Sequence, residues 1–164
     1  ATNGKRTEFL DIYLGAKCQF FLGSPTGIEI VPELFRRPVV HTNWVHLPNI
    51  YTWIQNSLII PKKLYLSEEN RFLNFRELIY SEIGLFGRSE DYEKRGIEVI
   101  ENTPEEILAV ASEMDERLNG TWETSEEDEN LQQRFWALFE PNKLKSPGLR
   151  IGADFLRENK DWIC

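Results

Sequence analysis

The first forty residues switch repeatedly between helix-like and strand-like spacing of their hydrophobic positions. Residues 7–16 place apolar side chains three and four positions apart, which predicts a short helix. Residues 18–22 form a short apolar run typical of a buried strand, residues 28–35 return to helical spacing, and residues 38–42 predict a second strand. Two strands joined by one short helix imply parallel pairing with a right-handed crossover.

The rest of the chain predicts further strands at 58–60 and 96–100 and helices at 73–80, 103–120, 125–139 and 149–162. One of these helices has a clear start, with Thr103 as N-cap, Pro104 in the first turn and Glu106 completing a capping box. We therefore predict an α/β fold. A Rossmann-like parallel sheet flanked by helices occupies residues 1–120, and a helical C-terminal extension, residues 121–164, packs on the same domain.

The net charge of the chain and its distribution exclude some classes of binding partner. The chain has 164 residues, about one domain, and a net charge of −8. Non-specific nucleic-acid binding needs a basic field, so we expect no nucleic-acid partner. Residues 101–130 hold eleven acidic residues and one basic residue, Arg117, which predicts a solvated helical face. The first hundred residues are close to neutral and would tolerate an anionic ligand better.

The two cysteines, Cys18 and Cys164, are too few for a disulfide framework and fit a reducing compartment. No apolar run approaches the roughly 20 residues that span a membrane, and no signal peptide is visible. We therefore expect a cytoplasmic chain that does not span a membrane.

The loop between the first strand and the following helix is the clearest candidate for ligand binding. It consists of Ser24, Pro25, Thr26 and Gly27. In open parallel sheets, ligands bind beyond the carboxyl ends of the strands, and the free amides at a helix start attract anions. Gly27 has no Cβ to hold a phosphate away from the backbone. The pattern predicts a diphosphate site on Ser24, Thr26 and Gly27, and the alternative is a plain strand-to-helix turn.

Other polar residues are candidates near the same edge of the sheet. Glu29 could accept hydrogen bonds from sugar or ribose hydroxyls, or it is an exposed helix carboxylate. Asn43 could contact the sugar or the base, or it is a turn residue. Trp44 and Trp53 could stack on a base, although tryptophans of this kind are more often part of the core.

The remaining reactive residues show no comparable pattern. His41 and His46 lack the i, i+4 spacing and the neighbouring cysteines of a metal site, so we predict no metal and no cofactor. Lys62 and Lys63 could pair with phosphate, but solvated lysines are the commoner case. The sequence assigns no catalytic residue, because no Ser-His-Asp or Cys-His arrangement can be identified in it.

A family resemblance covers nearly the whole chain and rests on residues 11–27, 32–40, 56–63, 72–77, 96–107, 120–122, 133–136 and 150–153. These stretches resemble a family of bacterial glycosyltransferases associated with surface-polysaccharide gene clusters. The loop at 24–27 also looks like the Ser-Gly-Gly turn of nucleotide-sugar epimerases and other two-domain (GT-B-like) enzymes, where it holds the donor diphosphate. Here Pro25 and Thr26 stand in place of the tighter glycine, which leaves one fewer amide free to donate.

The resemblance implies a donor-side part of a glycosyltransferase in polysaccharide biosynthesis, with a nucleotide-diphosphate sugar as substrate. Ser24, Thr26 and Gly27 then hold the diphosphate, and Glu29 and Asn43 contact the sugar or nucleoside. Family members are longer, and the resemblance places this chain at their C-terminal end. An acceptor-side domain and the catalytic base are therefore expected outside it, and the chain is expected to be inactive alone.

Two other functions stay open. A non-catalytic binding or assembly module derived from such a domain could be a homodimer, and it would expose a large apolar patch near Trp44 and Trp53. An epimerase or hydrolase acting on nucleotide sugars would need a full set of acid and base groups, which the sequence does not offer.

Overall fold

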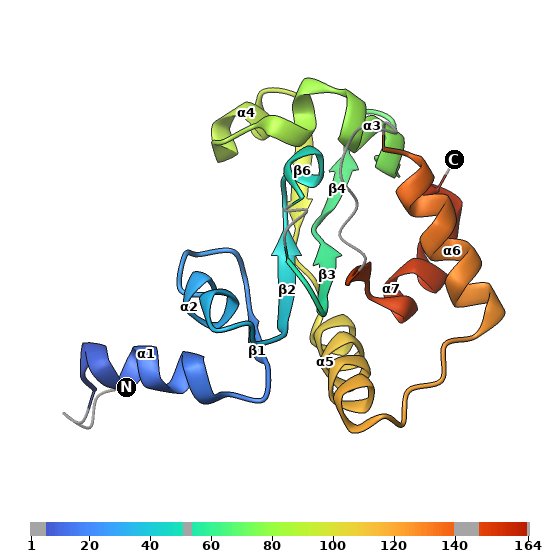
Figure 1. Ribbon diagram of the computed structural model, residues 1–164. Helices are drawn as coiled ribbons and strands as arrows, with labels where there is room; N and C mark the ends of the chain where they lie inside the picture. Colours follow the sequence, from blue (N-terminus) through green and yellow to red (C-terminus); the bar gives the residue numbers. More distant parts are fainter. Residues whose placement is uncertain (1–5, 51–53, 140–147, 164) are drawn as a thin grey trace.

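A four-stranded parallel sheet lies at the centre of the molecule (Figure 1). The computed structural model describes residues 6–50, 54–139 and 148–163. The strands are β1 (Phe21–Gly23), β2 (Val39–Trp44), β3 (Ser57–Pro61) and β7 (Leu149–Ile151). They stand in the order β1-β2-β3-β7, and every neighbouring pair is parallel. Helices flank this sheet, so the predicted Rossmann-like α/β fold is confirmed.

The N-terminal part of the sheet is built as the hydrophobic spacing predicts. Helix α1 (Glu8–Lys17) precedes β1, helix α2 (Ile30–Leu34) joins β1 to β2, and the 3-10 turn η1 (Leu47–Asn49) lies between β2 and β3. The crossover helix is shorter than predicted, because the chain passes through turns up to Glu29 before the helix begins. Helix α1 packs beside α2 and extends away from the sheet (Figure 1).

A second sheet grows directly out of the first. Only Lys62 separates β3 from β4 (Lys63–Leu66), which pairs antiparallel with β5 (Arg71–Phe72) and β6 (Ile97–Ile100) in the order β5-β4-β6. Between β5 and β6 the chain forms α3 (Phe75–Tyr80), η2 (Glu82–Leu85) and α4 (Ser89–Glu93). The strand predicted at 96–100 is therefore present, and it belongs to this antiparallel sheet.

A pair of asparagines holds the two sheets together. The backbone amide of Asn43 donates to Oδ1 of Asn102 at 2.6 Å, and the backbone amide of Asn102 donates to Oδ1 of Asn43 at 2.8 Å. The Asn102 amide nitrogen also donates to the carbonyl of Pro61 at 2.8 Å. Asn43 has a φ of 55°, in the left-handed region that Asn tolerates, at the point where the pairing of β2 and β3 becomes irregular. This link joins the end of β6 to the ends of β2 and β3.

Helix α5 (Pro104–Asn119) begins and ends at the residues that the sequence indicates. The hydroxyl of Thr103 accepts from the amide of Glu106 at 3.2 Å, and the Glu106 carboxylate accepts from the amide of Thr103 at 2.8 Å. At the other end Gly120 has a φ of 71°, a conformation that closes the helix at little cost only for glycine. The predicted capping box and stop signal are both confirmed.

The C-terminal segment is less helical than predicted. It contains α6 (Glu126–Ala137), β7, α7 (Ala153–Glu158) and η3 (Lys160–Trp162). The prediction of one helix over 149–162 is wrong in its first part, because Leu149 and Ile151 point into the core on either side of Arg150 and follow the two-residue period of a strand. The segment thus contributes the fourth strand of the main sheet as well as helices that cover it.

The core lies between the sheets and the helices of the C-terminal half. Its largest fully buried side chains include Phe75 and Phe135, whose rings meet edge to face with centroids 5.1 Å apart. The ring of Trp162 packs against Phe75 at 5.9 Å, which brings the end of the described chain onto α3. Aromatic rings therefore join α3, α6 and η3 to a single core.

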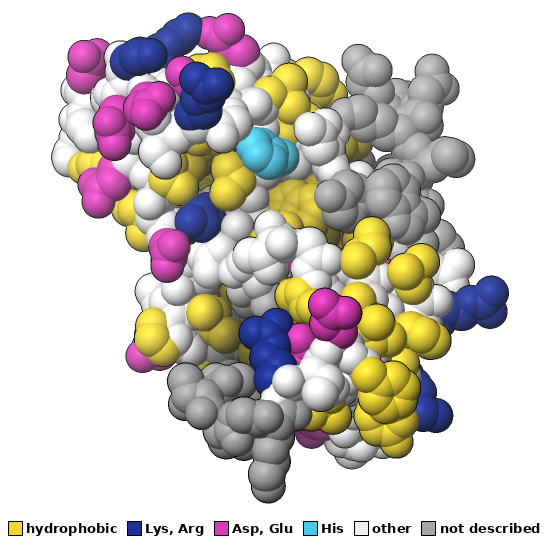
Figure 2. All heavy atoms as spheres, turned by 90° about the vertical axis from the view of Figure 1, so that its left-hand side faces the viewer, with side chains coloured by type: hydrophobic (Ala, Val, Ile, Leu, Met, Phe, Trp, Pro, Cys, Tyr) yellow, Lys and Arg dark blue, Asp and Glu magenta, His cyan; other side chains and the backbone are white. Residues whose placement is uncertain are grey.

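The opposite side of the molecule is strongly apolar at its surface. Nine of the thirteen large hydrophobic side chains that are exposed in the described residues belong to α1, β1, α2 and their flanking turns. They are Phe9, Ile12, Tyr13, Leu14, Leu22, Ile28, Ile30, Leu34 and Phe35, and we call this surface the apolar face. Figure 2 looks onto this side, where hydrophobic side chains gather towards the lower right.

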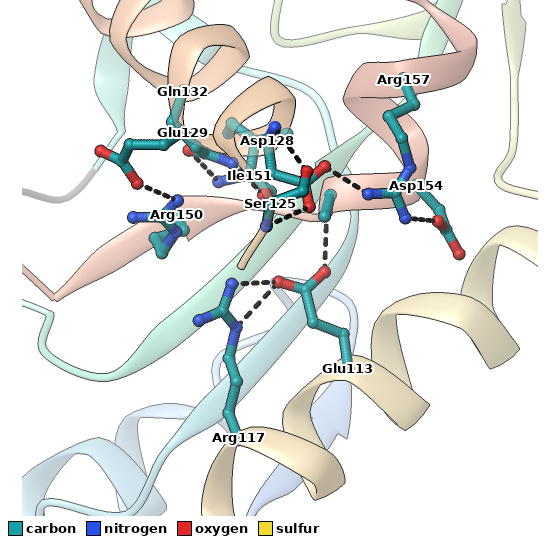
Figure 3. A network of polar contacts seen from close by, with 11 residues as sticks. Glu113, Arg117, Ser125, Asp128, Glu129, Gln132, Arg150, Ile151, Asp154 and Arg157 are labelled. Carbon is teal, nitrogen blue, oxygen red and sulfur yellow. Dashed lines mark hydrogen bonds and ion pairs between the residues drawn. The ribbon is translucent and has the colours of Figure 1, made fainter. Parts of the chain in front are cut away.

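A network of polar contacts ties α5, α6 and α7 to the edge strand β7 (Figure 3). The carboxylate of Glu113 accepts from the amide of Ala153 at 2.7 Å and from Arg117 Nε at 2.9 Å, and burial raises its pKa. The side-chain amide of Gln132 pairs with both backbone groups of Ile151, accepting from its N–H and donating to its carbonyl. Gln132 thus forms with Ile151 the pair of hydrogen bonds that the backbone of a neighbouring strand would form.

The same network contains a buried aspartate. Asp128 bonds to the amide of Ser125 at 3.2 Å and to the guanidinium of Arg157. Burial alone would raise the pKa of Asp128, but these hydrogen bonds to the charged form outweigh it, and its pKa is lowered. The acidic stretch at 101–130 is therefore not purely a solvated face, since Glu113 and Asp128 are both buried inside it.

We expect the asparagine link to be a major contributor to stability. Replacing Asn102→Ala leaves the amide of Asn43 and the carbonyl of Pro61 without partners and should lower the free energy of unfolding by about 2–3 kcal/mol. Asn119→Ala is the matched control, because Asn119 is exposed and should change stability by less than about 0.5 kcal/mol. Urea unfolding measures both, and equal stabilities of the two variants would contradict the assignment.

Asp128 predicts a defined dependence of stability on pH. Because its folded pKa is lowered, its contribution is complete above the unfolded pKa of about 3.9 and is lost as the pH falls through the folded value. Asp128→Asn should therefore be less stable than the native chain by about 1–3 kcal/mol at pH 7. The difference should shrink as the pH falls below about 4. Urea unfolding at several pH values tests this, and a difference independent of pH would contradict it.

Candidate functional site

The predicted diphosphate loop is occupied by a side chain of the protein itself. The backbone amides of Thr26 and Gly27 donate to Oε2 of Glu29, at 3.1 and 2.7 Å. The Glu29 side chain is not an exposed carboxylate, since the residue is only 7% exposed. The structure thus brings Thr26, Gly27 and Glu29 together as expected. However, the anion at the amides is Glu29, and the expectation that these amides are free is wrong.

The backbone explains why Glu29 reaches these amides. Gly27 has a φ of 101°, which turns the chain back on itself, and helix α2 starts only at Ile30. Glu29 is therefore the residue before the helix, and its side chain folds over the preceding turn instead of projecting from a helix. Ser24 is half-buried at the start of the loop, whereas Thr26 and Gly27 are exposed.

Asn43 is used within the fold. Its side chain and its backbone amide both bond to Asn102, as described above, so the turn interpretation accounts for it. Trp44 is buried, and its indole N–H donates to the carbonyl of His46 at 3.0 Å, which agrees with a core role. Trp53 lies outside the described residues. The exposed apolar surface lies on α1 and α2 and not at Trp44.

A pocket of about 410 Å³ opens between the end of α2 and the segment before β3. It is lined by Glu33, Arg36, Arg37, Ile54, Gln55 and Asn56. The volume falls within the usual range for small-molecule sites, roughly 300–1,000 Å³. Two guanidinium groups, one carboxylate and two side-chain amides line a single cavity, which is a composition suited to a polar, anionic ligand.

The carboxylate of Glu33, which lines the pocket, pairs with the fully buried imidazole of His41. Oε1 of Glu33 lies 3.3 Å from Nε2 of His41, and the two side chains are 10% and 0% exposed. Beyond this contact, neither ring nitrogen of His41 nor Glu33 Oε1 has a hydrogen-bond partner among the described residues. The pair holds a largely buried carboxylate at the wall of the pocket, where it can accept hydrogen bonds from a polar ligand.

The backbone at the end of α2 places the two arginines. Arg36 has a φ of 55°, and its amide donates to the carbonyl of Glu33 at 2.9 Å, while the amide of Arg37 donates to the carbonyl of Pro32 at 2.9 Å. These bonds close the helix end and turn both arginines to the pocket. Arg37 Nε also donates to the carbonyl of Ala16 at 2.8 Å, which ties α1 to the wall of the pocket.

The lysines that the sequence offered as phosphate partners bind carboxylates instead. Lys62 lies 3.2 Å from Glu101, and Lys63 lies 3.0 Å from Glu106. Within the described residues, no group of three or more His, Cys, Asp or Glu side chains could hold a metal ion. No helix in that part of the chain is long and apolar enough to cross a membrane.

Comparison with known proteins does not identify a family for this chain. No protein-family model, no curated protein and no solved structure matches the chain.

Sequence reasoning missed this pocket although the signal was partly visible. Arg36 and Arg37 stand at the C-terminal end of the helix predicted over 28–35, where cations suit the helix dipole, and this local explanation hides any role in binding. Glu33 stands four positions after Glu29 in an otherwise apolar helix, and an acidic residue repeated at that interval is a reason to look for a partner. Its partner His41 lies on a neighbouring strand and cannot be identified from spacing.

The loop geometry leads to a test of Glu29. Glu29→Ala removes the acceptor from two backbone amides and should lower the free energy of unfolding by about 1–2 kcal/mol. Glu123→Ala, which changes an exposed carboxylate in a loop, should leave stability unchanged within about 0.5 kcal/mol. Thermal and urea unfolding measure both, and a neutral Glu29→Ala would mean that the carboxylate does not stabilise the turn.

Proposed function

We propose that this chain binds a nucleotide-diphosphate sugar in the pocket between α2 and β3, as the donor-side part of a glycosyltransferase. The observation that carries the proposal is the buried Glu33–His41 pair beside a cavity that also contains Arg36 and Arg37. The proposal moves the expected diphosphate contacts from the loop at 24–27 to these arginines, because Glu29 already occupies the loop amides.

Glu33 supports recognition of a hydroxylated ligand. An ionised carboxylate accepts hydrogen bonds and donates none, so its natural partners are hydroxyl groups such as those of ribose or a sugar. Oε1 faces His41 at 3.3 Å, and this contact orients the carboxylate within the site. A carboxylate held in this way can bind a diol without rearrangement, which reduces the entropic cost of binding.

The arginines support recognition of a diphosphate. Guanidinium groups form paired hydrogen bonds with phosphate oxygens, and their charge persists at any physiological pH. The bond from Arg37 Nε to the carbonyl of Ala16 restrains the Arg37 side chain. The bond from the backbone amide of Arg36 to Glu33 fixes the backbone of Arg36 at the same helix end. Gln55 and Asn56 add amide donors and acceptors on the opposite wall, a combination that suits the edge of a nucleobase.

The proposal assigns donor binding to this chain and does not assign the transfer step. A binding module without catalysis would use the same pocket in the same way. The two are distinguished by turnover when the acceptor-side domain is also supplied, because only a transferase then releases the free nucleoside diphosphate from its donor in the presence of an acceptor.

Calorimetry with a panel of uridine, guanosine, adenosine and cytidine diphosphate sugars tests the proposal. We expect one class to bind the native chain. Arg36→Ala and Glu33→Gln should each weaken this binding by about 10- to 100-fold, since a hydrogen bond to a charged group contributes about 1.5–3 kcal/mol. Absence of binding for every member of the panel would reject the proposal.

Two control variants locate the site. Arg95→Ala removes a guanidinium that pairs with Glu82 on the other side of the fold and should leave affinity unchanged. Gly27→Val blocks the loop at 24–27 and should also leave affinity unchanged, although its φ of 101° makes it less stable. If Gly27→Val abolishes binding while Arg36→Ala does not, the ligand lies on the loop and the pocket assignment is wrong.

A further inference from the structure

We infer that the apolar face of α1, β1 and α2 is the contact surface for a second copy of this chain. This surface lies apart from the core, since α1 buries none of its residues completely. Phe9 and Leu34 are both 75% exposed, and the remaining members of the apolar face are between 41% and 56% exposed. Monomeric proteins rarely expose a contiguous apolar surface of this kind.

The area is close to that of a standard interface. An aromatic side chain has about 150–250 Å² to bury and a Leu or Ile roughly 100 Å², so the nine side chains at roughly half exposure present about 700 Å². A standard protein interface buries about 800 Å² on each partner. The apolar face alone therefore supplies most of the area that a specific contact needs.

Charge favours a second copy over a charged partner. Residues 6–37 contain equal numbers of basic and acidic residues, namely Arg6, Lys17, Arg36, Arg37 and Glu8, Asp11, Glu29, Glu33. The chain as a whole carries a net charge of −8, so two copies repel each other over most of their surface. They can approach closely at this neutral face. A face without basic excess has no electrostatic attraction for an anionic membrane.

The edge of the sheet reinforces this choice. Among the described strands, β1 pairs only with β2 and forms one edge of the parallel sheet. Leu22, at its centre, is 41% exposed. A twofold axis beside β1 would set two such edges and two α1–α2 pairs against each other, so that each copy covers the same residues of its partner.

The test is the mass of the full chain in solution. Light scattering after size exclusion at about 20 µM should give a particle of twice the chain mass, as expected for a contact of this size. Phe9→Glu and Leu34→Glu place a charge in the interface and should each give a monomer at that concentration. Leu108→Glu is the matched control, because Leu108 is 67% exposed on α5, outside the apolar face, and this variant should remain a dimer.

Each other outcome overturns the inference. A native chain that is monomeric at about 100 µM has no such interface. A dimer that persists in both Phe9→Glu and Leu34→Glu uses another surface. A monomer that sediments with phosphatidylcholine vesicles, and no longer does so as Phe9→Glu, would assign the face to a lipid surface. Far-ultraviolet circular dichroism establishes that the variants are folded, which is expected because the changed side chains are exposed.

Discussion

The reciprocal hydrogen bonds between Asn43 and Asn102 are the constraint on which the rest of the architecture depends. They lie where β3 continues into β4 after a single residue, so one extended segment serves a parallel sheet and then an antiparallel one. Asn102 also immediately precedes Thr103, the N-cap of α5, and this helix packs on β2 and β3. One buried side chain therefore links both sheets immediately before the N-cap of the longest described helix.

Elements with local signals could be predicted from the sequence. Helix α5 has Thr103, Pro104 and Gly120 at its boundaries, and the structure places the helix between them. Strand β7 could not be predicted, because three residues are too few to show an alternating pattern against the helical spacing around them. Its stability comes from β3 on one side and Gln132 on the other, and neither contact is local in sequence.

The candidate site likewise combines a feature that is visible in the local sequence with contacts between residues that are far apart in the sequence. The turn at 24–27 and its glycine were visible, but the carboxylate that fills the turn depends on where α2 begins, which differs from the predicted start by two residues. The pocket depends on a contact between α2 and β2 and on residues just before β3. Only the Arg36–Arg37 pair was conspicuous in the sequence, and it had an adequate explanation at the end of a helix.

The bond from Gln132 to Ile151 has a consequence for how far association can proceed. Because a side-chain amide satisfies both backbone groups of Ile151, this part of the outer border of β7 offers no template to an incoming strand. At the opposite end of the parallel sheet, β1 pairs only with β2 among the described strands. Contacts made there close on themselves after two molecules, whereas a sheet with two available borders could polymerise without limit into fibres.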